Sequence, residues 1–221
     1  MKIDIVYDNE ADGEYRADWG FSCFLPEHGI MFDVGANAEI LSHNMSLLKI
    51  SKENISVLVL SHDHWDHVGG LDAVLHKDLN VYVLSTFSTT TKEKIGAVAH
   101  LHECDDSVPL GEGIMTTGIL HNDVADEQSL VIFDGDEGLV ITACAHAGVG
   151  AVLDKAKGFG EISAILGGFH GFEDFDVLES MSYIGACHCT EHLKALRQRY
   201  PKTSHNLFAG KKLKFPFEKK R

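Results

Sequence analysis

The sequence predicts a mixed α/β fold in which two β-sheets pack against each other and helices cover their outer faces. Short strand-like segments alternate with helix-like segments along all 221 residues, and both halves of the chain are rich in strands. The length allows one large domain or two small ones and is enough to bury a sizeable core. The hydrophobic fraction of 44% and the charged fraction of 24% are ordinary for a soluble globular protein.

The spacing of apolar residues places the elements of the first half of the chain. The turn Pro-Glu-His-Gly at 26–29 separates two short apolar segments and predicts a hairpin. The mostly apolar segment 55–60 predicts a buried strand, and a run of histidines follows it directly. The expected strands are 1–7, 21–25, 30–34, 55–60 and 81–84, and the expected helices are 39–48, 71–75 and 92–102.

The second half repeats this arrangement of short strands and helices. The acidic turn 134–138 is expected to join two apolar strands. The expected strands are 129–133, 139–143, 162–166, 185–189, 206–209 and 212–215, and helices are expected over 150–157, part of 174–183 and 191–200.

Charge restricts the function classes. The formal net charge is −14, which argues against nucleic acid as the main partner because phosphates would be repelled. Cationic residues nevertheless cluster near residue 221, where we expect a solvated tail, with a weak contact to an anion or a partner as the alternative. These residues are Lys211, Lys212, Lys214, Lys219, Lys220 and Arg221.

Membrane and disulfide signals are missing from the sequence. No apolar run approaches the roughly 20 residues that a membrane span needs, and the first residues do not resemble a signal peptide. We therefore expect a cytoplasmic protein without a membrane partner.

The five cysteines are odd in number and contain no Cys-x-x-Cys pair, which fits reduced thiols better than disulfides. The sequence leaves the oligomeric state open.

The run Ser-His-Asp-His-Trp-Asp-His at 61–67 is the strongest chemical feature of the sequence. His62 and His64 follow the buried strand and, being two positions apart, are expected to point to the same face and reach one metal ion. Asp66 and His67 lie in the next bend and can reach a second ion. A solvated polar turn is the alternative. A buried strand that stops at such a run argues against it, because buried polar groups cost several kcal/mol unless a metal or another partner satisfies them.

Written as Ser-His-x-His-x-Asp-His-x-Gly-Gly, residues 61–70 resemble the signature of the metallo-β-lactamase superfamily. The segments Phe-Asp-Val-Gly at 32–35 and Thr-Ala-Cys-Ala-His-Ala-Gly at 142–148 resemble two further strand ends of that family. Within it, the chain is most similar to a group named for metal-dependent hydrolases and a pterin ribofuranosyl-aminobenzene phosphate synthase. The marks of this group are Asp8-Asn9, Gly20-Phe21-Ser22, Glu127-Gln128-Ser129-Leu130, Gly167-Gly168-Phe169-His170 and His188-Cys189-Thr190.

The resemblance implies a single domain over 1–221, folded as a four-layer αββα sandwich with two metal ions at one edge, between the sheets. His170 stands where many family members have an aspartate that bridges the ions, so it is a candidate ligand, and the second metal is expected to bind more weakly. The implied ligands are His62, His64 and His146 for the first metal, and Asp66 and His67 for the second, with His188 as the last ligand and His170 beside them.

The implied chemistry is hydrolytic. Nitrogen and oxygen ligands with open positions suit two divalent metal ions, with zinc as the first choice and manganese or iron as alternatives. Two ions about 3.5–4 Å apart share a water and lower its pKa toward about 7, so that the resulting hydroxide attacks the substrate. Asp66 is expected to be catalytic by orienting this hydroxide, and Asp33 to support a ligand histidine. The expected reaction is hydrolysis of an ester, phosphoester or related bond in a small-molecule substrate.

Other interpretations stay open at this point. The resemblance also allows a synthase that joins a phosphorylated ribosyl-aminobenzene to a pterin, and a metal-binding scaffold without turnover is a third candidate. Cys187 and Cys189 alternate with His188 and are expected to face away from the site as core residues, with metal binding as the alternative. His121 is expected in a loop, at the surface or facing the substrate, and the stretch 85–123 is expected to shape the mouth of an open pocket.

Overall fold

Two β-sheets form the centre of the protein in a computed structural model that describes residues 1–217. Within these residues, one sheet has seven strands in the order β13-β1-β2-β3-β4-β5-β6, and the other has six in the order β12-β11-β10-β9-β8-β7. The strands of the first are β1 (Lys2–Tyr7), β2 (Ser22–Leu25), β3 (Ile30–Phe32), β4 (Val57–Val59), β5 (Asn80–Val83), β6 (His100–Glu103) and β13 (Lys212–Lys214). Those of the second are β7 (Pro109–Gly111), β8 (Ile114–Thr116), β9 (Leu130–Asp134), β10 (Glu137–Thr142), β11 (Ala164–Gly168) and β12 (Tyr183–Cys187).

The inner faces of the two sheets share one apolar core. Ile3 and Ile5 on β1 pack into the same buried cluster as Leu139 and Ile141 on β10. Val140 lies between the last two on β10 and belongs to a different cluster, because successive side chains of a strand point to opposite faces. Each fully buried aliphatic side chain stabilises the fold by about 1.5–3 kcal/mol. The sheets are therefore held face to face mainly by hydrophobic burial.

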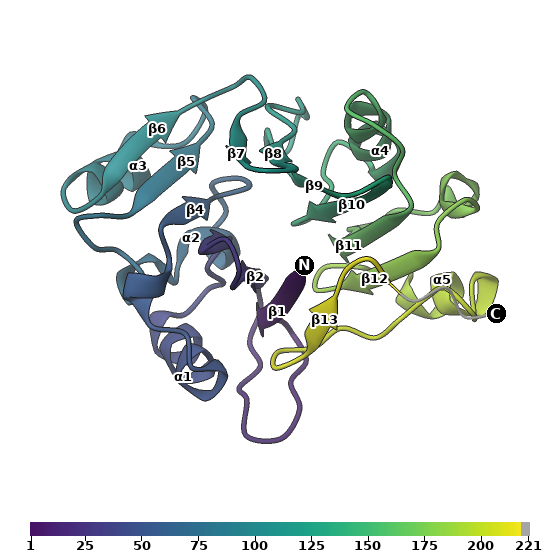
Figure 1. Cartoon of the computed structure of the whole chain (residues 1–221), viewed down its shortest axis with the longest axis horizontal. Helices are drawn as coiled ribbons and strands as arrows, with labels where there is room; N and C mark the ends of the chain where they lie inside the picture. The colour runs from purple at the N-terminus through teal and green to yellow at the C-terminus, as the bar shows by residue number, and fades with distance from the viewer. Residues whose placement is uncertain (218–221) are drawn as a thin grey trace.

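Helices cover the outer face of each sheet (Figure 1). α1 (Ala38–Leu48) and α3 (Thr89–Gly96) pack on the first sheet, and α4 (Val149–Lys157) and α5 (Leu193–Arg199) pack on the second. The Asn37 side chain caps α1 by accepting two backbone N–H groups of its first turn, which otherwise lack partners. The helix buries Leu41, Met45 and Leu48 on one face. The layers follow the predicted order αββα.

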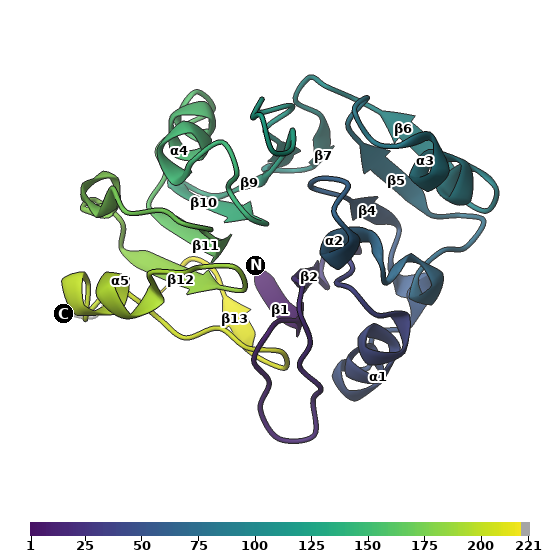
Figure 2. The same ribbon diagram turned by 180° about the vertical axis from the view of Figure 1, so that it is seen from behind.

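Parallel pairing brings several strand ends to one edge of the sandwich. β3, β4, β5 and β6 are parallel neighbours, as are β10, β11 and β12. The carboxyl ends of parallel strands share an edge of their sheet, where ligands of α/β proteins commonly bind. The short helix α2 (Trp65–Val68) follows β4 at this edge, beside the junction of the two halves of the molecule (Figure 2).

Several sequence-based expectations differ from the structure. The helix expected over 92–102 ends at Gly96, and residues 100–103 form β6, an edge strand whose half-exposed side chains lack the alternation that would predict it. The stretch 85–123, expected to shape the pocket mouth, contributes β7, which is the edge strand of the second sheet, and its short neighbour β8. Residues 174–183 contain only the 3-10 helix Phe175–Leu178, and the helix expected at 71–75 is the 3-10 helix Leu71–Ala73. The 3-10 helix Lys52–Asn54 was not expected, and the strand expected at 206–209 is one bridge between Ala11 and Ala209.

Within residues 1–217, no helix is long and apolar enough to cross a membrane. The expected cationic tail falls partly outside these residues, since Lys219, Lys220 and Arg221 are not described. Lys212 and Lys214 are exposed on β13.

Candidate metal centre

The chemical groups of the site follow the ends of strands in both sheets. Asp33 follows β3, the histidine run follows β4, and His146 and His188 follow β10 and β12. The backbone φ is positive at three of these ends, with 54° at Asp33, 54° at Ala145 and 50° at His188. Non-glycine residues seldom adopt this conformation, which is typical of functional sites where surrounding contacts hold it. Side chains from both sheets meet at this edge.

The first candidate group consists of His62, His64 and His146, whose ligand nitrogens lie within 4.8 Å of one another. His62 Nε2 lies 3.1 Å from His64 Nδ1, and the His146 ring centroid lies 4.9 Å from that of His62. His146 Nε2 is buried and has no hydrogen-bond partner within residues 1–217. Burial and the neighbouring imidazoles lower the pKa of His62 well below its ordinary value. The ring is therefore neutral near pH 7 and keeps the lone pair that a metal ion needs.

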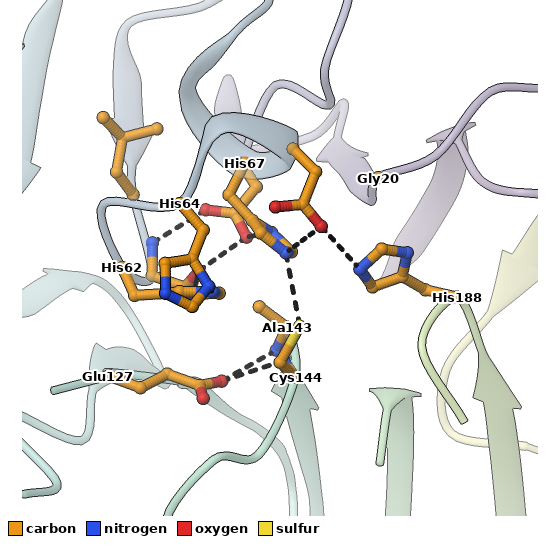
Figure 3. Close-up of polar contacts among 12 residues, drawn as sticks. Gly20, His62, His64, His67, Glu127, Ala143, Cys144 and His188 are labelled. Atoms are coloured by element: carbon orange, nitrogen blue, oxygen red, sulfur yellow. Dashed lines mark hydrogen bonds and ion pairs between the residues drawn. The ribbon is translucent and has the colours of Figure 1, made fainter. Parts of the chain in front are cut away.

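The second candidate group consists of Asp66, His67 and His188, and it adjoins the first (Figure 3). Asp66 Oδ2 lies 3.5 Å from His67 Nε2 and 3.4 Å from His188 Nε2. Burial opposes ionisation of Asp66, but contacts with these two imidazoles hold the pKa of its carboxyl far below the usual range. Burial lowers the pKa of His188 to about 4, against the opposing effect of Asp66. The group combines one carboxylate with a neutral imidazole in a buried position.

The donor atoms of both groups fit divalent cations. Two nitrogen or oxygen ligands of a tetrahedral zinc ion lie about 3.3 Å apart, given metal–ligand distances of about 2.0–2.1 Å. The Asp66 distances of 3.4 and 3.5 Å to its two imidazoles agree with this separation. Among the described residues, the buried Nε2 atoms of His146 and His188 have no partner with hydrogen-bond geometry, and His188 Nε2 has only its 3.4 Å ion-pair contact with Asp66, although burial of an unsatisfied polar atom is costly. A bound cation at each group would satisfy them.

Asp33 holds His67 in the orientation that this site requires. His67 Nδ1 donates to Asp33 Oδ2 over 2.8 Å, which leaves Nε2 as the nitrogen that faces the centre. The same carboxylate accepts from the backbone N–H and the hydroxyl of Ser61, each at 2.7 Å. A carboxylate that fixes the tautomer of a metal-binding histidine is common in metalloproteins. This contact fits the supporting role expected for Asp33, which stays a prediction until metal binding by His67 is measured.

Glu127 is a structural anchor of the candidate site that sequence reasoning missed. Its buried carboxylate accepts the backbone N–H group of Cys144 at 3.0 Å (Figure 3). It also accepts those of Ala145 at 3.0 Å and His146 at 2.9 Å. These bonds hold the bend that carries His146 into the first group. Glu127 lies in one of the segments that carry the family resemblance, but its partners are 17–19 residues away and no local pattern names them.

Two cysteines also lie in the centre. Cys144 Sγ lies 3.3 Å from His67 Nε2, and Cys144, His188 and Cys189 form a further group with donor atoms within 4.8 Å of one another. The expectation that Cys189 faces away from the site with Cys187 is wrong. β12 ends at Cys187, and the positive φ of His188 breaks the alternation on which that expectation depended. Cys187 is a buried core residue, as expected.

The structure does not bring His170 into any ligand group among the described residues. Its side chain is 48% exposed, and its Nδ1 lies 3.4 Å from Glu191 Oε1. The backbone φ of 44° at His170 turns the chain at the end of β11. His121 is also exposed, and its Nδ1 lies 3.1 Å from Asp126 Oδ1.

An open pocket of about 290 Å³ gives access to both groups. Asp66 and His146 line it, and the exposed rings of Trp19 and Trp65 flank it. His170 lies on the wall shared with an adjoining cavity of about 350 Å³. A cavity of about 400 Å³ lined by the chain start and the turn at 133–135 contains none of these ligands. The pocket at the metal centre is therefore where a substrate can meet the candidate metal ligands.

Comparison with known proteins agrees with this arrangement. The model of the metallo-β-lactamase superfamily matches residues 25–84, which contain the histidine run. An uncharacterized protein of Methanocaldococcus jannaschii is 29% identical over 231 residues, which cover 85% of this chain and 90% of the relative. The 7,8-dihydropterin-6-methyl-4-(β-D-ribofuranosyl)-aminobenzene-5′-phosphate synthase of the same organism is 26% identical over 250 residues, which cover 84% of each protein.

Solved structures share the fold over nearly the whole chain. A metal-dependent hydrolase of the β-lactamase superfamily has a TM-score of 0.80 and 21% identity, and the match covers 97% of this chain and 98% of the other. A metallo-β-lactamase fold protein of Bacillus subtilis has a TM-score of 0.68 and 13% identity, with 96% and 99% covered. At these identities the likeness concerns the fold alone. It confirms the predicted four-layer sandwich.

Proposed function

Because residues 25–84 match the model of the metallo-β-lactamase superfamily and the chain shares the fold, we propose that it is a metal-dependent hydrolase of this superfamily that cleaves an ester, phosphoester or related bond of a small molecule. The observation that carries this proposal is the position of the two ligand groups. They adjoin each other and border a pocket that a small molecule can enter. Two divalent cations, zinc in the first place and manganese or iron as alternatives, suit these nitrogen and oxygen donors.

The candidate ligands and Asp66 have separate roles in the proposed reaction. His62, His64 and His146 would hold one cation, and Asp66, His67 and His188 the other. When bound, such cations polarise a substrate oxygen and lower the pKa of a coordinated water. Asp66 keeps its negative charge, as its lowered pKa indicates, and it lines the pocket, so it can orient the attacking water by accepting a hydrogen bond from it.

The pocket lining limits the substrate class. Among the described residues that line it, none is Lys or Arg, and Glu191 adds a negative charge. Any anionic group of the substrate therefore has to bind to the cations. The rings of Trp19 and Trp65, 48% and 64% exposed, offer apolar faces beside the centre. We propose a small substrate with a flat or apolar portion next to the bond that is cleaved.

A synthase that acts on a pterin is the second candidate. A named relative is a dihydropterin ribofuranosyl-aminobenzene phosphate synthase, and the two tryptophan rings suit a flat heteroaromatic ring. Incubation of the metal-loaded protein with a pterin diphosphate and the aminobenzene ribotide separates the two proposals. A condensation product supports the synthase, and its absence together with turnover of an ester supports the hydrolase.

The main experiment is a panel of phosphodiesters, lactones, thioesters and carboxylic esters, run on protein of measured metal content. We expect hydrolysis of at least one class, and its loss in His62→Ala and Asp66→Ala with the fold largely intact. His100→Ala, exposed on the edge strand β6, is the matched control and should keep full turnover. Full turnover of Asp66→Ala with full metal content would contradict the mechanism. Bound metal without turnover across the panel and in the condensation assay would instead indicate a scaffold.

A further inference from the structure

The buried thiol of Cys144 lies between the two ligand groups. We propose that Cys144 binds as a thiolate ligand shared by the two cation sites, which makes the centre selective for thiophilic divalent cations such as zinc. The proposal rests on the proposed function only in taking the centre to hold two cations.

The first step in the argument is the direction of His67. Its Nδ1 is engaged by Asp33, so Nε2 is the nitrogen left for a cation, and this atom lies 3.3 Å from Cys144 Sγ. A nitrogen and a sulfur ligand of one tetrahedral zinc ion lie about 3.6 Å apart, given bond lengths of about 2.0–2.1 and 2.3 Å. The two atoms are therefore already placed as two ligands of one ion.

The second step is that Cys144 reaches both groups. Its Sγ lies within 4.8 Å of the ligand nitrogen of His62, which belongs to the first group, and of those of His67 and His188, which belong to the second. A donor that is close to both sets is in the position of a bridging ligand. His170, the other candidate for this role, is half exposed and contacts Glu191.

The third step is that a backbone hydrogen bond fixes the position of Cys144 in the bend. The N–H of Cys144 donates to the buried carboxylate of Glu127 over 3.0 Å, and its side chain is almost fully buried. The same carboxylate fixes His146 two residues later, so one anchor positions a ligand of the first group together with the thiol.

Coordination requires no change of oxidation state. The S–H bond of Cys144 is replaced by a metal–sulfur bond, and the proton passes to solvent. Thiolate is a soft ligand that favours zinc over magnesium, calcium or manganese, which prefer oxygen. A centre with this sulfur should therefore retain zinc at the second group more firmly than manganese.

The test uses the full chain loaded with Co²⁺, since a cobalt–thiolate bond produces a charge-transfer absorption band in the near ultraviolet. We expect this band in the wild-type protein and its loss in Cys144→Ser, together with binding of the second cation weakened tenfold or more. Cys104→Ser, whose thiol belongs to no ligand group among the described residues, is the matched control and should keep the band. Absence of the band from the fully loaded wild type, or its survival in Cys144→Ser, would overturn the proposal.

A second measurement covers the case in which Cys144→Ser does not fold. X-ray absorption of the zinc-loaded wild type should show sulfur among the zinc ligands, and a shell of nitrogen and oxygen alone would overturn the assignment. A band or sulfur shell that disappears in Cys189→Ser would do the same. These readouts do not involve turnover, so a protein with sulfur-bound metal and no hydrolase activity would disprove the proposed function and leave this inference standing.

Discussion

His67 Nδ1 and Asp33 Oδ2 lie 2.8 Å apart, and both side chains are fully buried. The contact joins the end of β3 to α2 and orients a candidate metal ligand. Burial disfavours the imidazolium, but the Asp33 carboxylate and then Asp66 outweigh it and raise the pKa of His67 to about 10 in the metal-free protein. Without metal, this histidine therefore carries a proton at neutral pH.

The first prediction concerns the pH dependence of stability in the metal-free protein. Between pH 6.5, the usual pKa of an unfolded histidine, and pH 10, the folded state binds more protons at His67 than the unfolded state does. The stabilisation is thus complete below pH 6.5 and is lost as the pH rises toward about 10. Urea unfolding with a chelator at pH 6.5 and 9.5 should show a decrease on the order of a few kcal/mol, larger than in His67→Gln. Equal decreases in the two proteins would contradict the assignment.

The second prediction concerns Glu127. In Glu127→Gln, an NH2 group replaces one of the two carboxylate oxygens. This group cannot accept a hydrogen bond, and it faces a backbone N–H of the bend 143–146. We expect a loss of about 2–4 kcal/mol in the free energy of unfolding, because buried bonds to a charged acceptor are lost. Cation binding at the first group should also weaken, measured by metal titration. Glu112→Gln, at an exposed position, is the control and should change stability by less than about 0.5 kcal/mol.

Local patterns in the sequence predicted most of the fold and the ligands that are close together in the chain. His62, His64 and His67 lie within six residues, so a buried strand that ended in them was enough to place them at one site. The segments that form β1 to β5 and β9 to β11 bury side chains on both faces or on alternate faces. Their sequences therefore show the continuous or alternating apolar residues that predict a strand. His146 and His188 needed the family resemblance, because a single histidine after a strand has no pattern of its own.

The remaining features depend on long-range contacts that no local pattern records. Glu127 acts as an anchor only because the backbone N–H groups of the bend 143–146 donate to its carboxylate in the folded protein. The direction of Cys189 depends on a positive φ at His188, which the alternation of a strand does not foresee. β6 exists because its backbone pairs with β5, and its half-exposed side chains do not reveal it.

The third prediction separates the two ligand groups. His146→Ala removes a donor from the first group, whereas His188→Ala removes one from the second and leaves the first intact. We expect each variant to bind one cation fewer than the wild type under conditions that saturate the wild type, measured by elemental analysis after gel filtration. His43→Ala, whose ring contacts a backbone carbonyl on the surface, should keep the wild-type content. If His188→Ala retained every cation, its place in the second group would be wrong.

The last prediction concerns Trp65, whose side chain is 64% exposed at the rim of the pocket. If the flat part of the substrate rests on this ring, Trp65→Ala removes about 1–2 kcal/mol of binding, which is roughly a 5- to 30-fold increase in KM. The metal ligands are untouched, so kcat should change little, and Trp65→Phe should recover most of the affinity. Trp19 is a poorer test, because its ring lies 5.3 Å from that of His188 and its loss would disturb the second group as well. An unchanged KM in Trp65→Ala, measured with the best substrate of the panel, would place the substrate elsewhere in the pocket.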